Sequence, residues 1–365
     1  MDQESDPLSR FELNGVEEKG REIGRGSYAV VEELDVRGLS CVGKSIHEEL
    51  YDNASDRERV DMLARFGVEC ELLSQVRHPH VVQFVGVHFK QGSRLPVLVM
   101  ERLDSTLSDC LDRYGKLPDE VSYPIIRDVA VGLRFLHGYV PNPIVHRDLT
   151  ANNVLLTSDM KAKISDLGVA KMLNLNPARM VQMTTCPGTP SYMPPEALVA
   201  KPIYSTKVDT FSYGNLMTHV FSGAWPIPTE AFRVDPSNPN VIVPATEVER
   251  REEYLQDMGD THPLIALTRQ CLSNNPLTRP EAPEILARIN EVMPQFPPSF
   301  RNKMAMLQQI ESDRNQKRSL TSKIEKQQQQ ITEYQRQIDK KDRRIAQLEM
   351  SHIRSQVPQV SVEMC

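Results

Sequence analysis

The sequence lacks the patterns that would place it outside the cell or in a membrane. No N-terminal apolar segment resembles a secretion signal, and no apolar run is long enough to span a bilayer. The C-terminus is not a prenylation signal, because that signal needs its cysteine four residues from the end. No Cys-x-x-Cys pair and no metal-ligand spacing with histidine occur among the six cysteines, Cys41, Cys70, Cys110, Cys186, Cys271 and Cys365. We therefore expect reduced thiols and a cytoplasmic protein.

The composition is ordinary for a globular protein, but the charge is unevenly distributed. The chain has 365 residues, of which 39% are hydrophobic and 25% charged, which is enough for one large two-lobed core plus an extension. Residues 301–350 hold a surplus of five positive charges, while the net charge of the whole chain is −6. The first 300 residues are therefore strongly acidic, which argues against a nucleic-acid partner for that part.

Three groups with the chemistry of phosphoryl transfer follow one another closely. Asp148 and Asn153 lie five positions apart in the segment 146–153, and Asp166 follows shortly after in an Asp-Leu-Gly sequence. Transfer of a phosphoryl group from ATP needs a carboxylate to accept the proton of the incoming hydroxyl. It also needs oxygen ligands, such as an Asn and a second Asp, that hold Mg²⁺ against the phosphates.

A glycine-rich segment lies upstream. Gly24 and Gly26 alternate with Arg25 and Ser27 in Gly-Arg-Gly-Ser-Tyr-Ala-Val-Val. Glycines at these positions would let the backbone approach phosphates, because they carry no Cβ. By itself such a segment is more often an ordinary turn.

A lysine and a glutamate follow the glycine-rich segment. Lys44 ends the sequence Cys-Val-Gly-Lys, at a distance from the glycines that suits a strand-turn-strand unit. Apolar residues at helical spacing indicate a helix over residues 65–76, which Pro79 terminates. Two glutamates of this helix, Glu69 and Glu71, are candidate ion-pair partners of Lys44.

In this order, these segments resemble the glycine-rich, catalytic and metal-binding loops of eukaryotic protein kinases, and most of all the tyrosine-kinase-like group of serine/threonine kinases. The resemblance implies an α+β, two-lobed fold, with a small β-rich lobe that includes one helix and a large helical lobe, followed by a long coiled-coil helix. The expected parts are an N-terminal extension (1–16), the kinase domain (17–293, with lobes at about 17–101 and 104–293), a Pro-rich linker (294–300), the coiled coil (301–350) and a disordered tail (351–365).

The resemblance also implies roles for individual residues. Asp148 would orient the substrate hydroxyl and accept its proton, and Lys44 would place the phosphates of ATP. Asn153 and Asp166 would hold Mg²⁺. The other nucleotide-binding residues implied are Gly24, Arg25, Gly26, Ser27, Val31 as a roof, Glu69 as partner of Lys44, Glu101 and Leu103 through their backbone, and Leu155 as a floor.

Further segments match the same family. Met100 stands where the family has its gatekeeper, although a plain core residue explains it equally well. Glu196, in a Pro-Pro-Glu sequence where the family has Ala-Pro-Glu, is expected to pair with Arg279. Asp209 matches the aspartate at the start of a central helix.

Some positions depart from the family and leave alternatives open. The pattern around Thr189 is typical of serine/threonine kinases, whereas Thr150 stands where these enzymes have a lysine. Ala29 replaces the third glycine, and Leu167 replaces the usual Phe. We expect a Ser/Thr kinase acting on proteins. The alternatives are a dual-specificity or tyrosine kinase, a pseudokinase scaffold, and a coiled-coil adaptor that binds ATP.

Regulation by phosphorylation is expected from Arg147. An arginine beside the catalytic carboxylate needs a further anionic partner. In kinases of this kind, that partner is a phosphate on the activation loop. Thr184 and Thr185 are the candidates to carry it, although both are also compatible with ordinary exposed loop residues.

The C-terminal segment carries a heptad pattern. No proline occurs between 299 and 357, and position a is taken by Ile324, Ile331, Ile338 and Ile345. The polar residues Gln327 and Lys341 at position d weaken the pattern. It favours a coiled coil and a homodimer through residues 301–350, against a single charged helix or a Gln-rich disordered segment.

Overall fold

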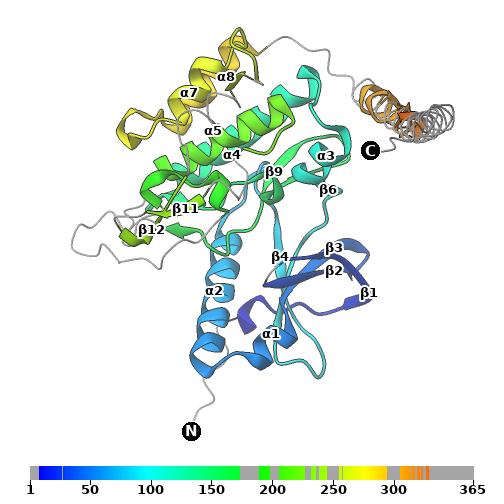
Figure 1. Cartoon of the computed structure of the whole chain (residues 1–365). Coiled ribbons are helices and arrows are strands. Elements are labelled where there is room, and N and C mark those ends of the chain that lie inside the picture. Colours follow the sequence, from blue (N-terminus) through cyan, green and yellow to red (C-terminus); the bar gives the residue numbers. More distant parts are fainter. Residues whose placement is uncertain are drawn as a thin grey trace, which may run out of the picture. The chain divides into compact units, whose positions relative to one another are not determined.

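A five-stranded antiparallel sheet begins the fold (Figure 1). Its strands lie in the order β1-β2-β3-β5-β4 and span β1 (Val16–Arg25), β2 (Ala29–Val36), β3 (Leu39–Ile46), β4 (Phe84–Phe89) and β5 (Pro96–Glu101). The tight β2–β3 turn is formed by Arg37 and Gly38, both with positive φ, of 54° and 87°. Asp35 accepts a hydrogen bond from the Gly38 amide at 2.6 Å, so local polar contacts fix the register of this hairpin.

The computed structural model describes most of the chain. The residues described are 8–26, 28–172, 189–197, 205–226, 232–235, 238–244, 255–256, 258–293, 305–313, 315–316, 319–320, 322–323 and 326–328.

The two faces of the sheet carry different residues. Val31 of β2 lies directly opposite Lys44 of β3, so their side chains share one face. Residues alternate along β3, so Gly43 and Ser45 point to the other face. A Cβ on Gly43 would come within 2.6 Å of the Leu34 and Val97 side chains, so a larger residue would clash there.

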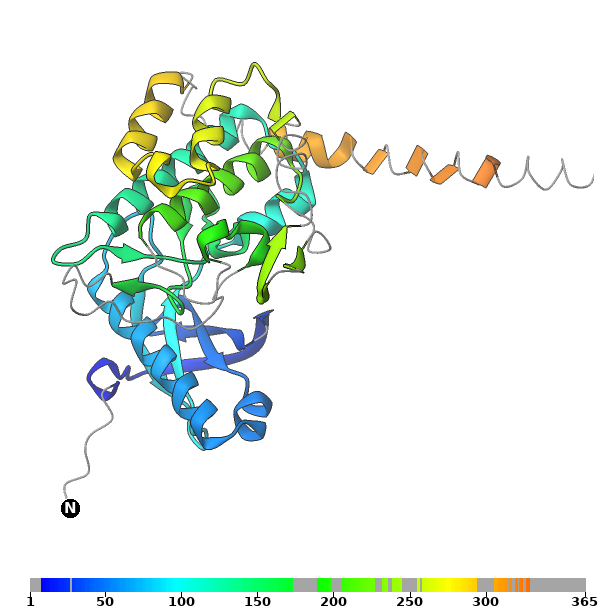
Figure 2. The same ribbon diagram turned by 60° about the vertical axis from the view of Figure 1, so that its left-hand side comes forward.

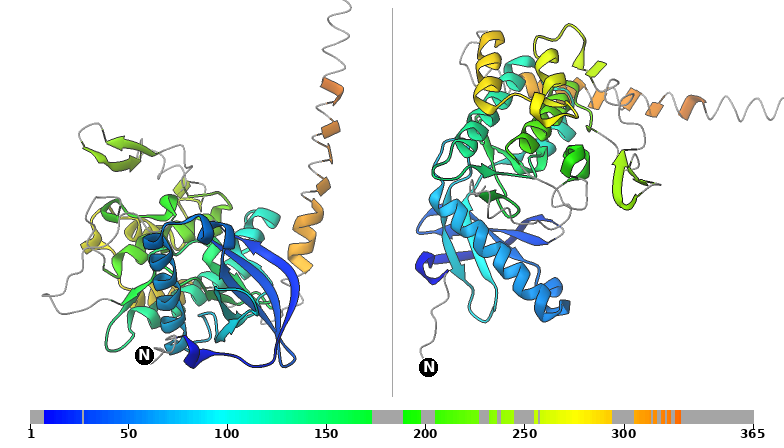
Figure 3. Two further views of the ribbon diagram at one scale, coloured as in Figure 1. Left: turned by 90° about the horizontal axis from the view of Figure 1, so that it is seen from below. Right: turned by 90° about the vertical axis from the view of Figure 1, so that its left-hand side faces the viewer.

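Two helices follow β3. The short α1 (Glu48–Asn53) leads into α2 (Asp56–Gln75), which lies next to β4 (Figures 1 and 3). The apolar spacing predicted this helix only from residue 65. The helix begins nine residues earlier because Ser55 forms a capping box with Glu58, a polar start signal that apolar spacing does not detect.

The second lobe is mainly helical (Figure 2). Its helices are α3 (Leu107–Tyr114), α4 (Asp119–His137), α5 (Lys207–Ser222), α7 (Ile265–Cys271) and α8 (Ala282–Val292). Most of α5 is buried, and α4 packs against α5 and α8. Short strands connect these helices: β6 (Ser105–Thr106), β7 (Ile144–Val145), β8 (Val154–Leu156), β9 (Ala162–Ile164), β10 (Lys171–Met172), β11 (Phe232–Asp235) and β12 (Asn238–Pro244). A sheet lobe and a helical lobe agree with the two-lobed fold expected from the sequence.

Short 3₁₀ turns complete the fold. They are η1 (Ser9–Phe11), η2 (Ala151–Asn153), η4 (Pro190–Tyr192), η5 (Pro195–Ala197) and η7 (Pro276–Thr278). The turn η2 contains the predicted metal ligand Asn153. The backbone amide of Asn153 donates to the Thr150 carbonyl at 3.1 Å.

Residues 305–365 form a separate unit. The residues described between 305 and 328 are helical. All four heptad isoleucines lie outside the described residues, namely Ile324, Ile331, Ile338 and Ile345, as do the predicted linker 294–300 and the tail 351–365. The coiled coil therefore stays a prediction. Within the part of the chain described, no helix combines the length and apolar character needed to cross a bilayer.

Candidate active site

Three predicted residues meet where the two lobes join. Lys44 comes from β3, Glu69 from α2, and Asp166 from the segment after β9. The Lys44 ammonium donates to both oxygens of Glu69, at 2.8 and 3.0 Å, and to Oδ1 of Asp166 at 2.9 Å. The side chain of Glu69 is only 4% exposed, whereas that of Asp166 is 43% exposed. Glu69, rather than its alternative Glu71, is thus the partner of Lys44, since Glu71 pairs with Arg10 on the outside of α2.

This triad is electrostatically unbalanced. Burial by itself would lower the pKa of Lys44, but attraction to Glu69 and Asp166 outweighs it and raises that pKa above its usual range. Burial would raise the pKa of Asp166, but the charge and hydrogen bond of Lys44 outweigh it and lower that pKa. One ammonium thus faces two carboxylates, and the surplus negative charge lies at the more exposed one, Asp166.

Gly168 allows these carboxylates to come together. A Cβ on Gly168 would lie 3.0 Å from Oε2 of Glu69 and 3.1 Å from Oδ1 of Asp166. The Gly168 amide also donates to Asp166 Oδ1 at 3.2 Å. Leu167 beside it is fully buried, so this position takes an aliphatic side chain without leaving it in water.

The predicted catalytic carboxylate is held from both sides. Oδ1 of Asp148 accepts from the Thr189 amide at 2.8 Å, and Oδ2 accepts from Nδ2 of Asn153 at 2.9 Å. Nδ2 of Asn153 also donates to the Asp148 carbonyl at 2.8 Å. The orientation of Asp148 is therefore set before any substrate binds.

A buried aspartate on α5 holds the backbone before Asp148. Asp209 is inaccessible to solvent and accepts from the amides of His146 and Arg147 and from Nε2 of His137, each at 2.8 Å. Burial would raise the pKa of Asp209, but these donors and the nearby histidines lower it. Arg147 has a φ of 68°, a strained conformation that these hydrogen bonds over-determine.

The glycine-rich segment joins β1 to β2. A Cβ on Gly24 would meet nothing closer than Val31 at 3.7 Å, and one on Gly26 would meet the Ala29 carbonyl at 3.6 Å. Protein packing therefore does not require glycine at either position. The side chain of Arg25 bonds Glu22 and His47, so it is engaged with protein groups. Ser27 lies outside the described residues.

The segment between the lobes offers polar backbone atoms and apolar neighbours. Met100 is 7% exposed, which fits both a core and a gatekeeper role. The Glu101 carboxylate is occupied by Lys163, at 2.7 Å to each oxygen. Among the described residues, no hydrogen bond takes the Leu103 amide. Leu155 of β8 is half-buried on the other lobe.

The remaining polar atoms fit Mg²⁺ and a triphosphate. The side-chain nitrogen Nδ2 of Asn153 donates to Asp148, which leaves the side-chain oxygen Oδ1 of Asn153 for a metal ion. Lys44 and Gly168 use Oδ1 of Asp166, which leaves Oδ2. Carboxylate and amide oxygens are the hard donors that Mg²⁺ prefers, completed by phosphate and water oxygens. In the described part of the chain, no group of three or more His, Cys, Asp and Glu residues forms a self-contained metal site.

The predicted pair of Glu196 and Arg279 is present. Nη1 and Nη2 of Arg279 donate to the two oxygens of Glu196 at 2.5 and 2.9 Å. Arg279 is 2% exposed, lies over the Phe211 ring at 4.9 Å, and also bonds the Ser273 and Lys207 carbonyls at 2.7 and 3.0 Å. This buried, fully bonded guanidinium ties the segment after residue 188 to the helical lobe.

Sequence reasoning missed several supporting contacts. The Thr189 amide on Asp148, the role of His137 on Asp209, and the close approach at Gly168 all join residues distant in sequence. The only signal was the glycine of Asp-Leu-Gly itself. Thr184 and Thr185 lie outside the described residues, and Arg147 donates to the Val169 carbonyl.

Comparisons with known proteins agree with this geometry. The family model for the protein kinase domain matches residues 17–289. A probable serine/threonine-protein kinase of Dictyostelium discoideum is 29% identical over 283 residues, covering 76% of this chain and 42% of the relative.

Two further relatives carry different specificities in their names. Serine/threonine-protein kinase TNNI3K of Mus musculus is 33% identical, covering 60% of this chain and 25% of the relative. Seven transmembrane domain-containing tyrosine-protein kinase 1 of Dictyostelium discoideum is 30% identical, covering 60% of this chain and 31% of the relative. The chain thus spans a quarter to two fifths of the length of these three relatives. With the lysine, glutamate and two aspartates in place and the family model matching three quarters of its length, the chain belongs to the protein kinase domain family.

Proposed function

We propose that the protein transfers the γ-phosphate of ATP to serine or threonine hydroxyls of other proteins. The observation that carries this proposal is the joint geometry of two clusters. Lys44 bridges Glu69 and Asp166 within 3.0 Å, and Asp148 is oriented by Thr189 and Asn153 within 2.9 Å. Degenerate members of such a family commonly lack at least one residue of the catalytic set, and here the set is complete, with Lys44, Glu69, Asp148, Asn153 and Asp166.

Asp148 would act on the substrate hydroxyl. Because its two oxygens accept from donors on opposite sides, the carboxylate has a fixed direction in which a hydroxyl can approach. It would orient that hydroxyl and take its proton as the phosphoryl group is transferred. The gain comes from positioning, since the carboxylate needs no reorganisation when the substrate arrives.

Lys44, Asn153 and Asp166 would hold the nucleotide. Bound Mg²⁺ supplies neutralisation of the phosphate charges. The free oxygens of Asn153 and Asp166 are its proposed ligands, and Lys44, already fixed by Glu69, would contact the phosphates. Val31, on the same sheet face as Lys44, and Leu155 on the other lobe would enclose the adenine, with the Leu103 amide as a hydrogen-bond donor.

The choice of serine or threonine over tyrosine rests on the segment at Thr189. Its sequence pattern is that of serine/threonine kinases, and its amide contacts the proposed catalytic base at 2.8 Å. Thr150, where these enzymes carry a lysine, is 1% exposed and its hydroxyl has no hydrogen-bond partner among the described residues. A contact that a lysine would make to the phosphate is therefore missing, and the relatives include a named tyrosine kinase.

Two regulatory features complete the proposal. Phosphorylation of Thr184 or Thr185 would supply an anion for Arg147, and a coiled coil in residues 301–350 would bring two kinase domains together at high effective concentration. Replacing both threonines by Ala should lower activity, and purified full-length chain should have a dimeric mass at micromolar concentration.

Transfer of labelled γ-phosphate from Mg-ATP, followed by identification of the labelled amino acid, tests the function. The full chain and the Asp148→Asn variant are incubated with a generic protein substrate. Label on Ser or Thr that falls at least about 1,000-fold in the variant supports the proposal. Label on Tyr would replace the proposed specificity. No label from folded protein after treatment with an activating kinase would favour an ATP-binding scaffold instead.

A further inference from the structure

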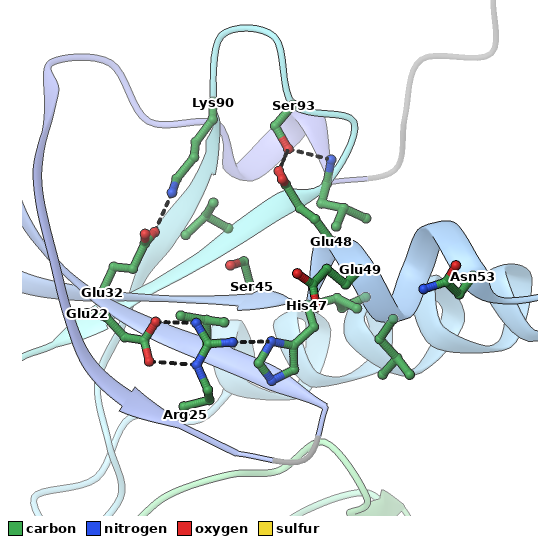
Figure 4. Close-up of a pocket in the computed structure, with 15 residues that line it drawn as sticks. Glu22, Arg25, Glu32, Ser45, His47, Glu48, Glu49, Asn53, Lys90 and Ser93 are labelled. Carbon is green, nitrogen blue, oxygen red and sulfur yellow. Dashed lines mark hydrogen bonds and ion pairs between the residues drawn. The ribbon is translucent and has the colours of Figure 1, made fainter.

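A pocket lies in the sheet lobe, away from the candidate active site (Figure 4). It has a volume of about 750 Å³, within the range of roughly 300–1,000 Å³ that is typical of ligand sites. Its lining comes from β1, β2, β3, β5, α1 and the turn between β4 and β5. Nothing in the proposed phosphotransfer uses it.

This pocket opens on the opposite face of the sheet from Lys44. Ser45, one residue after Lys44 on β3, lines the pocket, and neighbouring residues of a strand point to opposite faces. Val30, which pairs with Ser45 across the strands, and the buried Leu95 and Val97 give the pocket an apolar base. It is therefore separate from the nucleotide site.

The polar rim of the pocket carries an excess of negative charge. Two of its four glutamates are neutralised, because Glu22 pairs with Arg25 and Glu32 with Lys90. The other two, Glu48 and Glu49 of α1, are exposed and have no ion pair with a described cation. Glu48 accepts only from the Ser93 hydroxyl at 3.3 Å. An apolar base beside two unpaired carboxylates is complementary to a ligand with an apolar part and a cationic part.

The same rim is connected to the glycine-rich segment. Nη1 of Arg25 donates to Nδ1 of His47 at 3.3 Å, so the ring proton of His47 is on Nε2, which donates to the Gly26 carbonyl at 2.8 Å. Figure 4 shows Arg25 between Glu22 and His47, with Glu49 close to His47. A charge placed in this pocket thus acts on the side chains that hold Gly26.

We propose that this pocket binds a peptide segment that presents an arginine next to an apolar side chain, and that its occupancy controls the glycine-rich segment. The guanidinium would pair with Glu48 and Glu49, a charge-assisted contact, while the apolar side chain would pack on Val30 and Leu50, which line the pocket and are half-buried. Because Glu49 lies close to His47 (Figure 4), a guanidinium paired with Glu49 stands near the guanidinium of Arg25, and repulsion between the two like charges loosens the chain of contacts from Arg25 through His47 to Gly26. Peptide binding then weakens nucleotide binding, and by linkage the nucleotide weakens peptide binding by the same factor.

Binding of a capped Leu-Arg-Leu-Arg-Leu peptide to the full chain, measured by titration calorimetry, tests the site. We expect saturable binding that weakens about tenfold or more in the Glu48→Gln/Glu49→Gln variant and is lost with a Leu-Gln-Leu-Gln-Leu peptide. The matched control is Glu120→Gln, which removes an acidic residue from the first turn of another helix, α4. No binding, or equal binding by the double variant, overturns the proposal.

The regulatory part is tested by nucleotide binding, which does not depend on phosphotransfer. Saturating peptide should weaken the binding of a fluorescent ATP analogue by about fivefold or more, and the same peptide should have no effect on the double variant. Peptide binding without this change overturns the control of the glycine-rich segment. This inference rests on the proposed nucleotide site. If the analogue fails to bind without peptide, the proposed function fails while the peptide titration still decides the pocket.

Discussion

The two loops that flank the candidate active site are held in opposite ways. The loop with Asp148 is fixed by a buried group, because Asp209, which is inaccessible to solvent, accepts from the amides of His146 and Arg147. The glycine-rich segment is fixed by Arg25, Glu22 and His47, which are exposed or half-exposed. Hydrogen bonds in a low-dielectric interior are strong and costly to break, whereas exposed ion pairs contribute little. The protein thus has a rigid catalytic loop opposite a loop that a small change can release.

Removing the buried carboxylate should have the largest effect on stability. Asp209→Asn places an amide nitrogen against backbone donors and leaves one of them unpaired. We expect the free energy of unfolding to fall by about 3–4 kcal/mol, with phosphotransfer lost as well. Denaturant titration measures this fall in the free energy of unfolding. A loss under about 1 kcal/mol would mean that the catalytic loop is not held by this residue.

Acidification should destabilise the helical lobe, because it protonates the buried His219 of α5. Burial lowers the pKa of His219 to about 4, below the roughly 6.5 of an unfolded histidine. The unfolded chain therefore takes up this proton first, and stability is lost as the pH falls from about 7 towards 4, by about 2–3 kcal/mol at most. Nδ1 of His219 and the Tyr192 hydroxyl share a hydrogen bond at 2.7 Å. The difference between wild type and His219→Gln in denaturant titrations at pH 7 and pH 4.5 isolates this residue, and parallel pH profiles would contradict it.

A methyl group at the join of the two lobes should affect activity more than stability. Gly168→Ala pushes against Glu69 and Asp166, so Lys44 loses its position. We expect phosphotransfer to fall about 10- to 100-fold and the free energy of unfolding by about 1 kcal/mol. The control is Gly67→Ala on α2, where a Cβ meets nothing within 4 Å. Equal activity of the two variants would show that the close approach is not needed.

The exposed loop should show the smallest change in stability. Gly26→Ala adds a Cβ in ordinary contact at 3.6 Å, so the free energy of unfolding should stay within about 1 kcal/mol. Nucleotide affinity should nevertheless fall several-fold, because the methyl group occupies space proposed for phosphate. A calorimetric titration with Mg-ATP measures this. Unchanged affinity would mean that the phosphates do not approach Gly26.

Much of the candidate site could be predicted from the types of its residues and from the order in which its motifs follow one another along the chain. Lys44, Glu69 and Asp166 were each named from short motifs, and the structure brings them within 3.0 Å. The pair of Glu196 and Arg279 was also expected and is present. The start of α2 was not predicted, because residues 56–64 are mostly polar and only the capping box of Ser55 marks it. The coiled coil and the roles of Thr184 and Thr185 remain predictions.

The sequence by itself determined which groups are available and in which order, because catalytic residue types, glycines and helix signals are local properties of the chain. Only the tertiary structure decided which of these groups meet. Thr189 reaches Asp148 from 41 positions away, Asp209 reaches Arg147 from 62, and Glu49 shares a pocket with Lys90. Such contacts depend on how strands and helices pack, and packing is set by the shape and burial of the whole core, which no short segment contains.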